Sequence, residues 1–134
     1  MEMDEQPTSG AVDGRQTVSL QLSNEMVRLY KELFGRGPAW ARANFAGPDC
    51  VVVTLRHTLT PAEQSMVELG EYHRLRDVRL FFQHAREKDF RETAERVMGR
   101  RVRAFVSGID VKEDLATEIF YFHSETGDGA RGPR

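Results

Sequence analysis

The chain has 134 residues, of which 40% are hydrophobic and 30% are charged, and its formal net charge is -2 at pH 7. This length has room for one domain with a single core, and the balanced charge excludes an overall attraction to nucleic acid or to an anionic membrane. The lone cysteine, Cys50, excludes an internal disulfide and a thiolate metal cluster.

The two ends differ in composition from the rest of the chain. Residues 1–16 and 124–134 are rich in Gly, Pro, Ser and acidic residues and contain few large apolar groups, which predicts disordered tails. The single folded domain is therefore expected over residues 17–123. No window approaches the roughly 20 apolar residues of a membrane span, and the first residues lack the pattern of a signal peptide. The sequence thus predicts a cytoplasmic protein without a membrane span.

The first folded segment, residues 17–34, predicts a helix. Apolar residues recur at intervals of three and four from Val18 through Leu22 and Met26 to Leu33. This spacing is typical of a helix with one wide buried face.

The four residues that follow this helix read Gly35-Arg36-Gly37-Pro38. The first glycine stands where a left-handed helix cap is usual, and the proline prevents the helix from continuing. A phosphate-binding loop would follow a strand and open a helix, so we interpret this segment as a turn. Arg36 at its tip, together with Arg42, is a candidate for binding an anion.

Residues 39–45 and 50–57 predict a β-hairpin. The second run, CVVVTLRH, is rich in β-branched residues, and the turn-forming residues 46–49 separate the two runs.

Residues 59–70 predict a short helix with clear boundaries. Thr60 can cap it, Pro61 fits its first position, and Glu63 completes a capping box three residues after the threonine. Gly70 offers a stop.

A long helical stretch follows over residues 71–98. Its apolar stripes are Leu75, Val78, Phe82 and Ala85, then Phe90, Ala94 and Val97. The step of five between the stripes predicts a bend near Arg86, and Gly99 marks the end of the stretch. The stretch is long for so small a domain, so part of it is expected to extend beyond the sheet. Phe81 lies off the stripe beside Phe82, which makes this pair a candidate interface.

Residues 101–110 and 115–123 predict a second hairpin around the turn VKED. In the second arm, alternation directs Ala116, Phe120 and Phe122 to one face and Ile119 and Tyr121 to the other. A solvated face would carry polar residues, so the face of Ile119 and Tyr121 is expected to meet either helices of the same chain or a second copy in a homodimer.

The predicted order of elements is α-β-β-α-α-β-β. It favours an α+β two-layer sandwich in which an antiparallel sheet of two hairpins has helices packed on one face. The strand order within the sheet stays open.

Residues that could carry chemistry are scattered. The four histidines are His57, His73, His84 and His123. They lack the clustering of metal ligands, and no phosphate-loop or nucleophile motif occurs. The sequence therefore predicts no catalytic residues, no metal and no cofactor, and so a protein that is not an enzyme.

Arginines are frequent in and after the long helical stretch, and they open a second hypothesis of a nucleic-acid-binding regulator. Its candidate residues are Arg74, Arg76, Arg79, Arg100 and Arg101. Acidic residues are interleaved with them, including the pairs Glu87–Arg91 and Glu92–Arg96 at the favourable spacing of four. A solvated helix face with salt bridges is the stronger interpretation, which disfavours nucleic acid as a partner.

Three segments carry a family resemblance, namely "LSNEMVRLYKELFGRGP", "VVVTLRHTLTPAEQSMVELG" and "MGRRVRAFVSGIDVKEDLATEIFYF". Over about residues 20–122 the chain resembles the MpsC-like family of the Na+-translocating membrane-potential-generating system. The resemblance implies a bacterial accessory protein of a cation-translocating or inorganic-carbon-concentrating membrane system. It implies no known enzyme chemistry and no catalytic residues.

The leading hypothesis is a dimeric, non-enzymatic module that regulates or assembles a membrane transport system through protein contacts. Phe81, Phe82, Ile119 and Tyr121 are its candidate interface residues. The alternatives are the nucleic-acid-binding regulator and an anion sensor that uses Arg36 or Arg42 at a dimer seam.

Overall fold

A computed structural model describes residues 14–124, and its elements run α-β-β-α-α-α-β-β, which is the predicted order with the long second helical stretch divided into two helices. The helices are α1 (Gly14–Phe34), α2 (Pro61–Glu68), α3 (Tyr72–Ala85) and α4 (Glu87–Met98), and the strands are β1 (Trp40–Phe45), β2 (Cys50–Arg56), β3 (Val102–Asp110) and β4 (Leu115–Phe122). Helix α1 begins three residues before its predicted start at residue 17. The predicted tails lie mostly outside the described residues.

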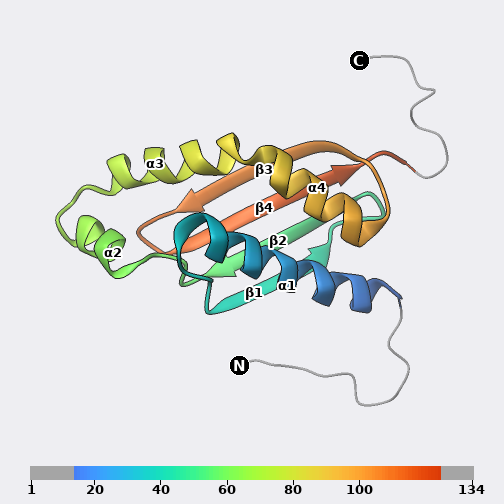
Figure 1. The fold of residues 1–134 in the computed structure, drawn as a ribbon, viewed down its shortest axis with the longest axis horizontal. Helices are drawn as coiled ribbons and strands as arrows, with labels where there is room; N and C mark the ends of the chain where they lie inside the picture. The colour runs from blue at the N-terminus through green and yellow to red at the C-terminus, as the bar shows by residue number, and fades with distance from the viewer. Residues whose placement is uncertain (1–13, 125–134) are drawn as a thin grey trace.

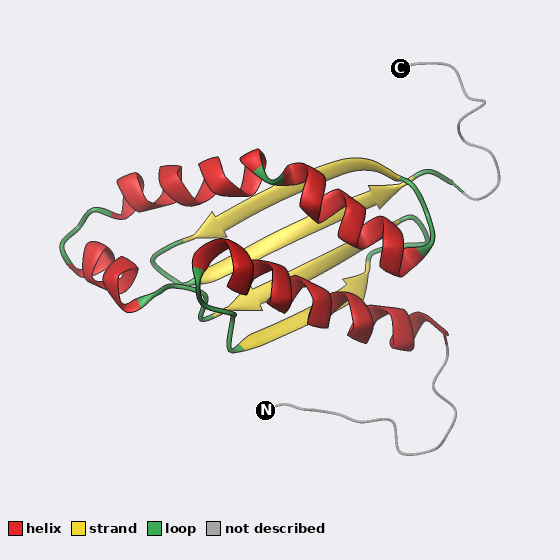
Figure 2. Ribbon diagram, in the orientation of Figure 1, coloured by secondary structure: helices red, strands yellow, loops and turns green. Residues whose placement is uncertain are grey.

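The four strands form one antiparallel sheet in the order β1-β2-β4-β3. Each hairpin pairs its own two strands, and the hairpins join where β2 runs beside β4, with Val53 opposite Glu118. The helices lie on one face of the sheet, with α1 over β1 and β2 and with α3 and α4 along β3 (Figures 1 and 2). The α+β two-layer sandwich with helices on one face is therefore confirmed.

The main core lies between this helical layer and the sheet. Its fully buried members include Leu22, Met26, Tyr30, Val51, Val53, Leu55, Phe90, Phe120 and Ala94. The aromatic rings at its centre stack in a row, Phe90 on Phe105 at 5.4 Å and Phe105 on Phe120 at 5.1 Å between centroids. The predicted buried stripe of α1 is thus confirmed, because it supplies much of this core.

Helix boundaries follow the local signals in the sequence. Gly35 has φ 78°, and its N–H donates to the Lys31 carbonyl at 2.8 Å, so it ends α1 in the left-handed conformation. Arg36 in the same turn donates from Nε and Nη2 to the His57 carbonyl, both at 3.3 Å, and Pro38 is buried. The segment is a turn, as predicted, and its arginine ties α1 to the end of β2.

The capping box of α2 is complete. The Glu63 N–H donates to Thr60 Oγ1 at 3.2 Å, and the Thr60 N–H donates to Glu63 Oε1 at 2.9 Å, with Pro61 at the first helical position. Gly70 and Gly99 follow α2 and α4 with φ of 84° and 69°.

The long helical stretch divides at Arg86, where α3 ends and α4 begins, which confirms the predicted bend. Helix α2 and the first turns of α3 project past the end of the sheet (Figure 1). A small separate cluster of Leu59, Leu75 and Val111 packs beneath them.

Candidate interaction surfaces

Helix α3 departs from an ordinary amphipathic helix, because it buries two polar side chains and leaves several large apolar ones exposed. Its buried residues are Leu75, Arg79 and Gln83. Val78, Phe81 and Phe82 lie on the outside, with 44%, 66% and 42% of their surface exposed. The predicted buried stripe through Val78 and Phe82 was therefore wrong, because polar contacts decide which face of this helix points inward.

Arg79 is fully buried and makes the first set of these contacts. Its Nε and Nη2 donate to the two carboxylate oxygens of Glu63 at 2.9 and 2.7 Å, and Nη2 also donates to the Thr58 carbonyl at 2.8 Å. The guanidinium lies 3.8 Å from the centre of the Phe34 ring. Burial alone would raise the pKa of Glu63, but the hydrogen bonds from Arg79 and Thr60 hold it below its usual value.

Gln83 makes the second set, around the fully buried carboxyl group of Glu118. Gln83 Nε2 and the Tyr30 hydroxyl donate to Glu118 Oε2 at 3.0 and 2.5 Å, and Gln83 Nε2 also donates to the Ser107 hydroxyl. Burial raises the pKa of Glu118 to about 7, although the hydrogen bonds from Ser107, Tyr30 and Gln83 lower it. The contacts of Arg79 and Gln83 together fix the orientation of α3.

The outward residues Val78, Phe81 and Phe82 form what we call the α3 patch. The Phe82 ring meets Phe81 at 5.4 Å and Phe34, at the end of α1, at 6.4 Å between centroids. An apolar and aromatic surface of this kind is typical of a protein-binding site. The candidate residues Phe81 and Phe82 therefore lie together.

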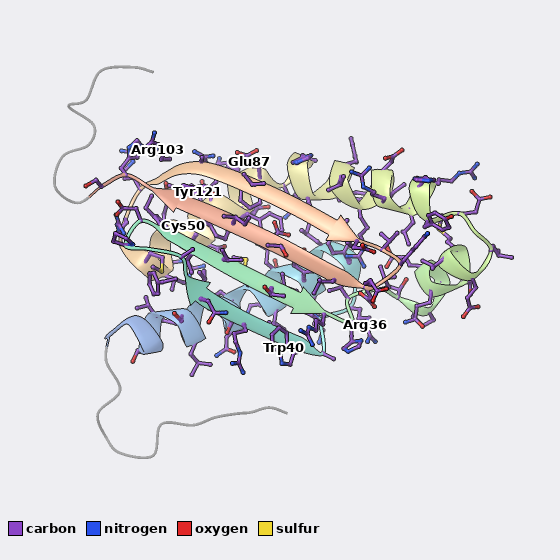
Figure 3. The ribbon with its side chains drawn as sticks, turned by 180° about the vertical axis from the view of Figure 1, so that it is seen from behind. Arg36, Trp40, Cys50, Glu87, Arg103 and Tyr121 are labelled. Carbon is purple, nitrogen blue, oxygen red and sulfur yellow. The ribbon has the colours of Figure 1, made fainter. Side chains whose placement is uncertain are left out.

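The second surface is the sheet face opposite the helices, which we call the open face. Its residues, by strand, are Trp40, Arg42 and Asn44 in β1; Cys50, Val52, Thr54 and Arg56 in β2; Leu115, Thr117, Ile119 and Tyr121 in β4; and Ala104, Val106, Gly108 and Asp110 in β3. No helix of residues 14–124 covers this face (Figure 3). Of the two alternatives for Ile119 and Tyr121, cover by helices of the same chain is therefore wrong for the described residues.

The two arginines proposed for anion binding do not form one site. Arg36 donates to the His57 carbonyl, whereas Arg42 lies on the open face with its guanidinium 5.4 Å from the centre of the Trp40 ring. Arg56, which pairs with Trp40 across the hairpin, lies 4.5 Å from the same ring. Both Arg42 and Arg56 thus stack on the tryptophan.

The arginines suggested for nucleic acid are likewise not one surface. Arg79 is in the interior, and Arg100 donates to the Asp49 carboxylate at 2.6 Å and to the carbonyls of Pro48 and His123. On α4, the predicted Glu87–Arg91 pair is present at 2.9 Å. Elsewhere on the helix, Lys88 pairs with Glu92 and Arg96 reaches Glu25 of α1.

Sequence reasoning missed the buried polar residues and the cluster around Trp40. A carboxylate among apolar neighbours in β4, at Glu118, was the one local signal for a buried polar network. The stacking of Arg42 and Arg56 on Trp40 depends on the register in which β1 pairs with β2, and the sequence pattern of each strand alone does not give that register.

None of the helices within residues 14–124 combines the length and the apolar character needed to cross a membrane. In the same range, no three His, Cys, Asp or Glu side chains lie together as metal ligands would.

A family model described as "Na+-translocating membrane potential-generating system (MpsC)" matches residues 15–124, which include every strand and every helix except the first residue of α1. No curated protein and no solved structure matches the chain.

Proposed function

Because the chain belongs to the MpsC family of the Na+-translocating membrane potential-generating system, we propose that it is a non-enzymatic accessory or regulatory protein of a membrane system that translocates a cation or inorganic carbon. It acts through protein–protein contacts, as expected for a module whose described helices do not span the membrane.

The α3 patch is the observation that carries this proposal. A domain that served only its own stability would place Phe81 and Phe82 inside and leave Arg79 in water, because buried charge is costly. The opposite arrangement breaks a local rule of folding, and such breaks concentrate at functional sites. A partner that covers the patch would remove the exposed aromatic rings from water and so explain their position.

The patch also lies on a helix that buried contacts anchor, which favours binding. The buried contacts of Arg79 with Glu63 and Phe34 fix α3 from beneath, so the outer rings are presented without a prior rearrangement. A surface that is ordered before binding loses little conformational entropy when the partner arrives.

The test is affinity purification of the tagged chain from its own cells in a mild detergent, with the co-purifying proteins identified by mass spectrometry. We expect the wild type to retain a membrane protein and Phe81→Asp to lose it. The substitution places a charge in the contact and removes burial worth about 1.5–3 kcal/mol, or roughly a tenfold to hundredfold change in affinity.

Leu20→Asp is the matched control. Leu20 is 62% exposed, close to the 66% of Phe81, but it lies on α1, away from the patch. This variant should retain the partner as the wild type does. Equal recovery of the membrane protein with Phe81→Asp would refute the role of the patch. Recovery of nucleic acid alone would support the regulator hypothesis instead.

A further inference from the structure

We propose that the open face is a self-association surface, on which a second copy of the chain packs sheet against sheet. The inference is independent of the proposed function, since it concerns the face opposite the α3 patch.

The middle of the open face carries a row of apolar residues suited to such packing. Val52, Ile119 and Val106 are direct neighbours across three strands, and Thr54 and Thr117 form the adjoining row. Val106 is 51% exposed, although β-branched residues favour positions covered on both sides of a sheet. This row is suited to the interior of a sandwich of two sheets, where facing layers lie about 10 Å apart.

The two edges of the face are complementary to each other in charge and shape. At the β1 edge, Arg42 and Arg56 stack on Trp40 and form a bulky cationic ridge. At the β3 edge, Gly108 has open space where a side chain would stand, and the exposed Asp110 supplies a carboxylate. The surface therefore carries both a ridge and a recess of opposite charge.

The difference between the two edges determines which two-fold axis relates the two copies. Two copies form a closed dimer when a two-fold axis lies in the plane between the sheets. An axis perpendicular to the strands keeps the two basic β1 edges on the same side. An axis parallel to the strands, between β2 and β4, places each β1 edge over the β3 edge of the second copy. The second arrangement seats Arg42 over Gly108 and brings Trp40 and its arginines to Asp110, so like charges are separated and opposite charges meet.

The area of the face agrees with a specific dimer of modest affinity. Four strands at about 4.8 Å spacing and six residues at about 3.3 Å give roughly 400 Å² of projected area per copy. The accessible area of protruding side chains exceeds this projection. The total therefore falls near the lower limit of specific interfaces and predicts a concentration-dependent equilibrium.

The test is sedimentation equilibrium of the full chain over a range of concentrations, with Gly108→Arg as the variant. Gly108 lies in a strand without a positive φ, and an added Cβ meets no atom within 4 Å, so the substitution spares the folded monomer. The new side chain fills the recess and places a cation opposite Arg42. We expect the wild type to dimerise and the dissociation constant of Gly108→Arg to rise by about tenfold or more.

Gly14→Arg is the matched control, since it makes the same substitution at an exposed glycine at the start of α1, where an added Cβ also meets no atom within 4 Å. It should dimerise like the wild type. Val106→Asp is a second disrupting variant on the middle row, and circular dichroism of each variant verifies its fold. A wild type that stays monomeric at concentrations on the order of 100 μM overturns the proposal, as does a folded Gly108→Arg that dimerises normally.

Discussion

Glu118 places an ionisable group in the interior of the protein, between the sheet and the helices α1 and α3. Its side chain is fully buried, and its Oε1 atom has no hydrogen-bond partner within the described structure. The nearest polar groups come from Tyr30 on α1, Gln83 on α3 and Ser107 on β3. A neutral carboxyl group is better accommodated there than a carboxylate, which is why burial raises its pKa to about 7.

This raised pKa predicts a stability that falls as the pH rises. The folded protein holds a proton on Glu118 between its unfolded pKa of 4.5 and its folded value of about 7, whereas the unfolded chain has released it. The contribution is complete below pH 4.5, declines by roughly 1.4 kcal/mol per pH unit through this window and levels off above it.

Chemical denaturation of the wild type and of Glu118→Gln between pH 4 and pH 8 isolates this effect, because glutamine stays neutral. We expect the free energy of unfolding of the wild type to fall by about 3 kcal/mol more than that of Glu118→Gln as the pH rises through this window. A difference between the two proteins that does not vary with pH would show that Glu118 titrates normally.

Gly35 tests the turn that ends α1. Its φ of 78° suits glycine, and no atom lies within 4 Å of an added Cβ, so a substitution there acts through backbone strain alone. Gly35→Val should lower the free energy of unfolding by more than about 1 kcal/mol, and Gly35→Asn by less, because asparagine tolerates the left-handed region. Equal losses for the two variants would contradict a left-handed cap.

Helix α2 illustrates how an element without a core of its own is held in place. None of its residues is fully buried, and it is attached by the capping box, by the ion pair between Glu63 and Arg79 of α3, and by packing of the partly buried Met66 and Val67 against the cluster of Leu59, Leu75 and Val111. The Asp114 carboxylate strengthens the same corner by accepting from the N–H groups of Thr58 and Leu59 at 2.7 and 3.2 Å.

Removal of Arg79 should therefore release α2 before the rest of the domain. We expect Arg79→Ala to destabilise the protein by about 3 kcal/mol, because it breaks a buried ion pair. Hydrogen exchange should accelerate most in α2 and the start of α3, while α1 and α4 keep their protection. A uniform acceleration over all helices would show that α2 is not a separate unit.

The helices also show how far local sequence patterns extend. The capping box of α2, the break at Arg86 and the buried face of α1 were all predicted, because each depends on residues within a few positions of one another. The inward face of α3 was not, since the partners of Arg79 and Gln83 lie on α1, on α2 and the segment before it, and on β3 and β4. Apolar periodicity alone pointed to Val78 and Phe82.

For the whole molecule, the element order and the two hairpins could be predicted from the sequence, but the strand order could not. Each hairpin is closed by a short turn, whereas the contact of β2 with β4 depends on the complete core beneath it. The open face was likewise predicted only in part. Alternation in β4 predicted the outward position of Ile119 and Tyr121, but the open face of four strands exists only after the hairpins join.

That central junction also determines how the chain reaches its fold. Hairpins with short turns form within microseconds, while β2 and β4 meet only after the loop that contains α2, α3, α4 and β3 has closed. The barrier to folding is therefore expected at the union of two preformed halves, and substitutions at the seam, such as Val53→Ala, should slow folding more than equally destabilising changes in α2. Until that union, each half presents an unpaired strand edge to its surroundings, so the slowest step of folding is also the one most exposed to aggregation.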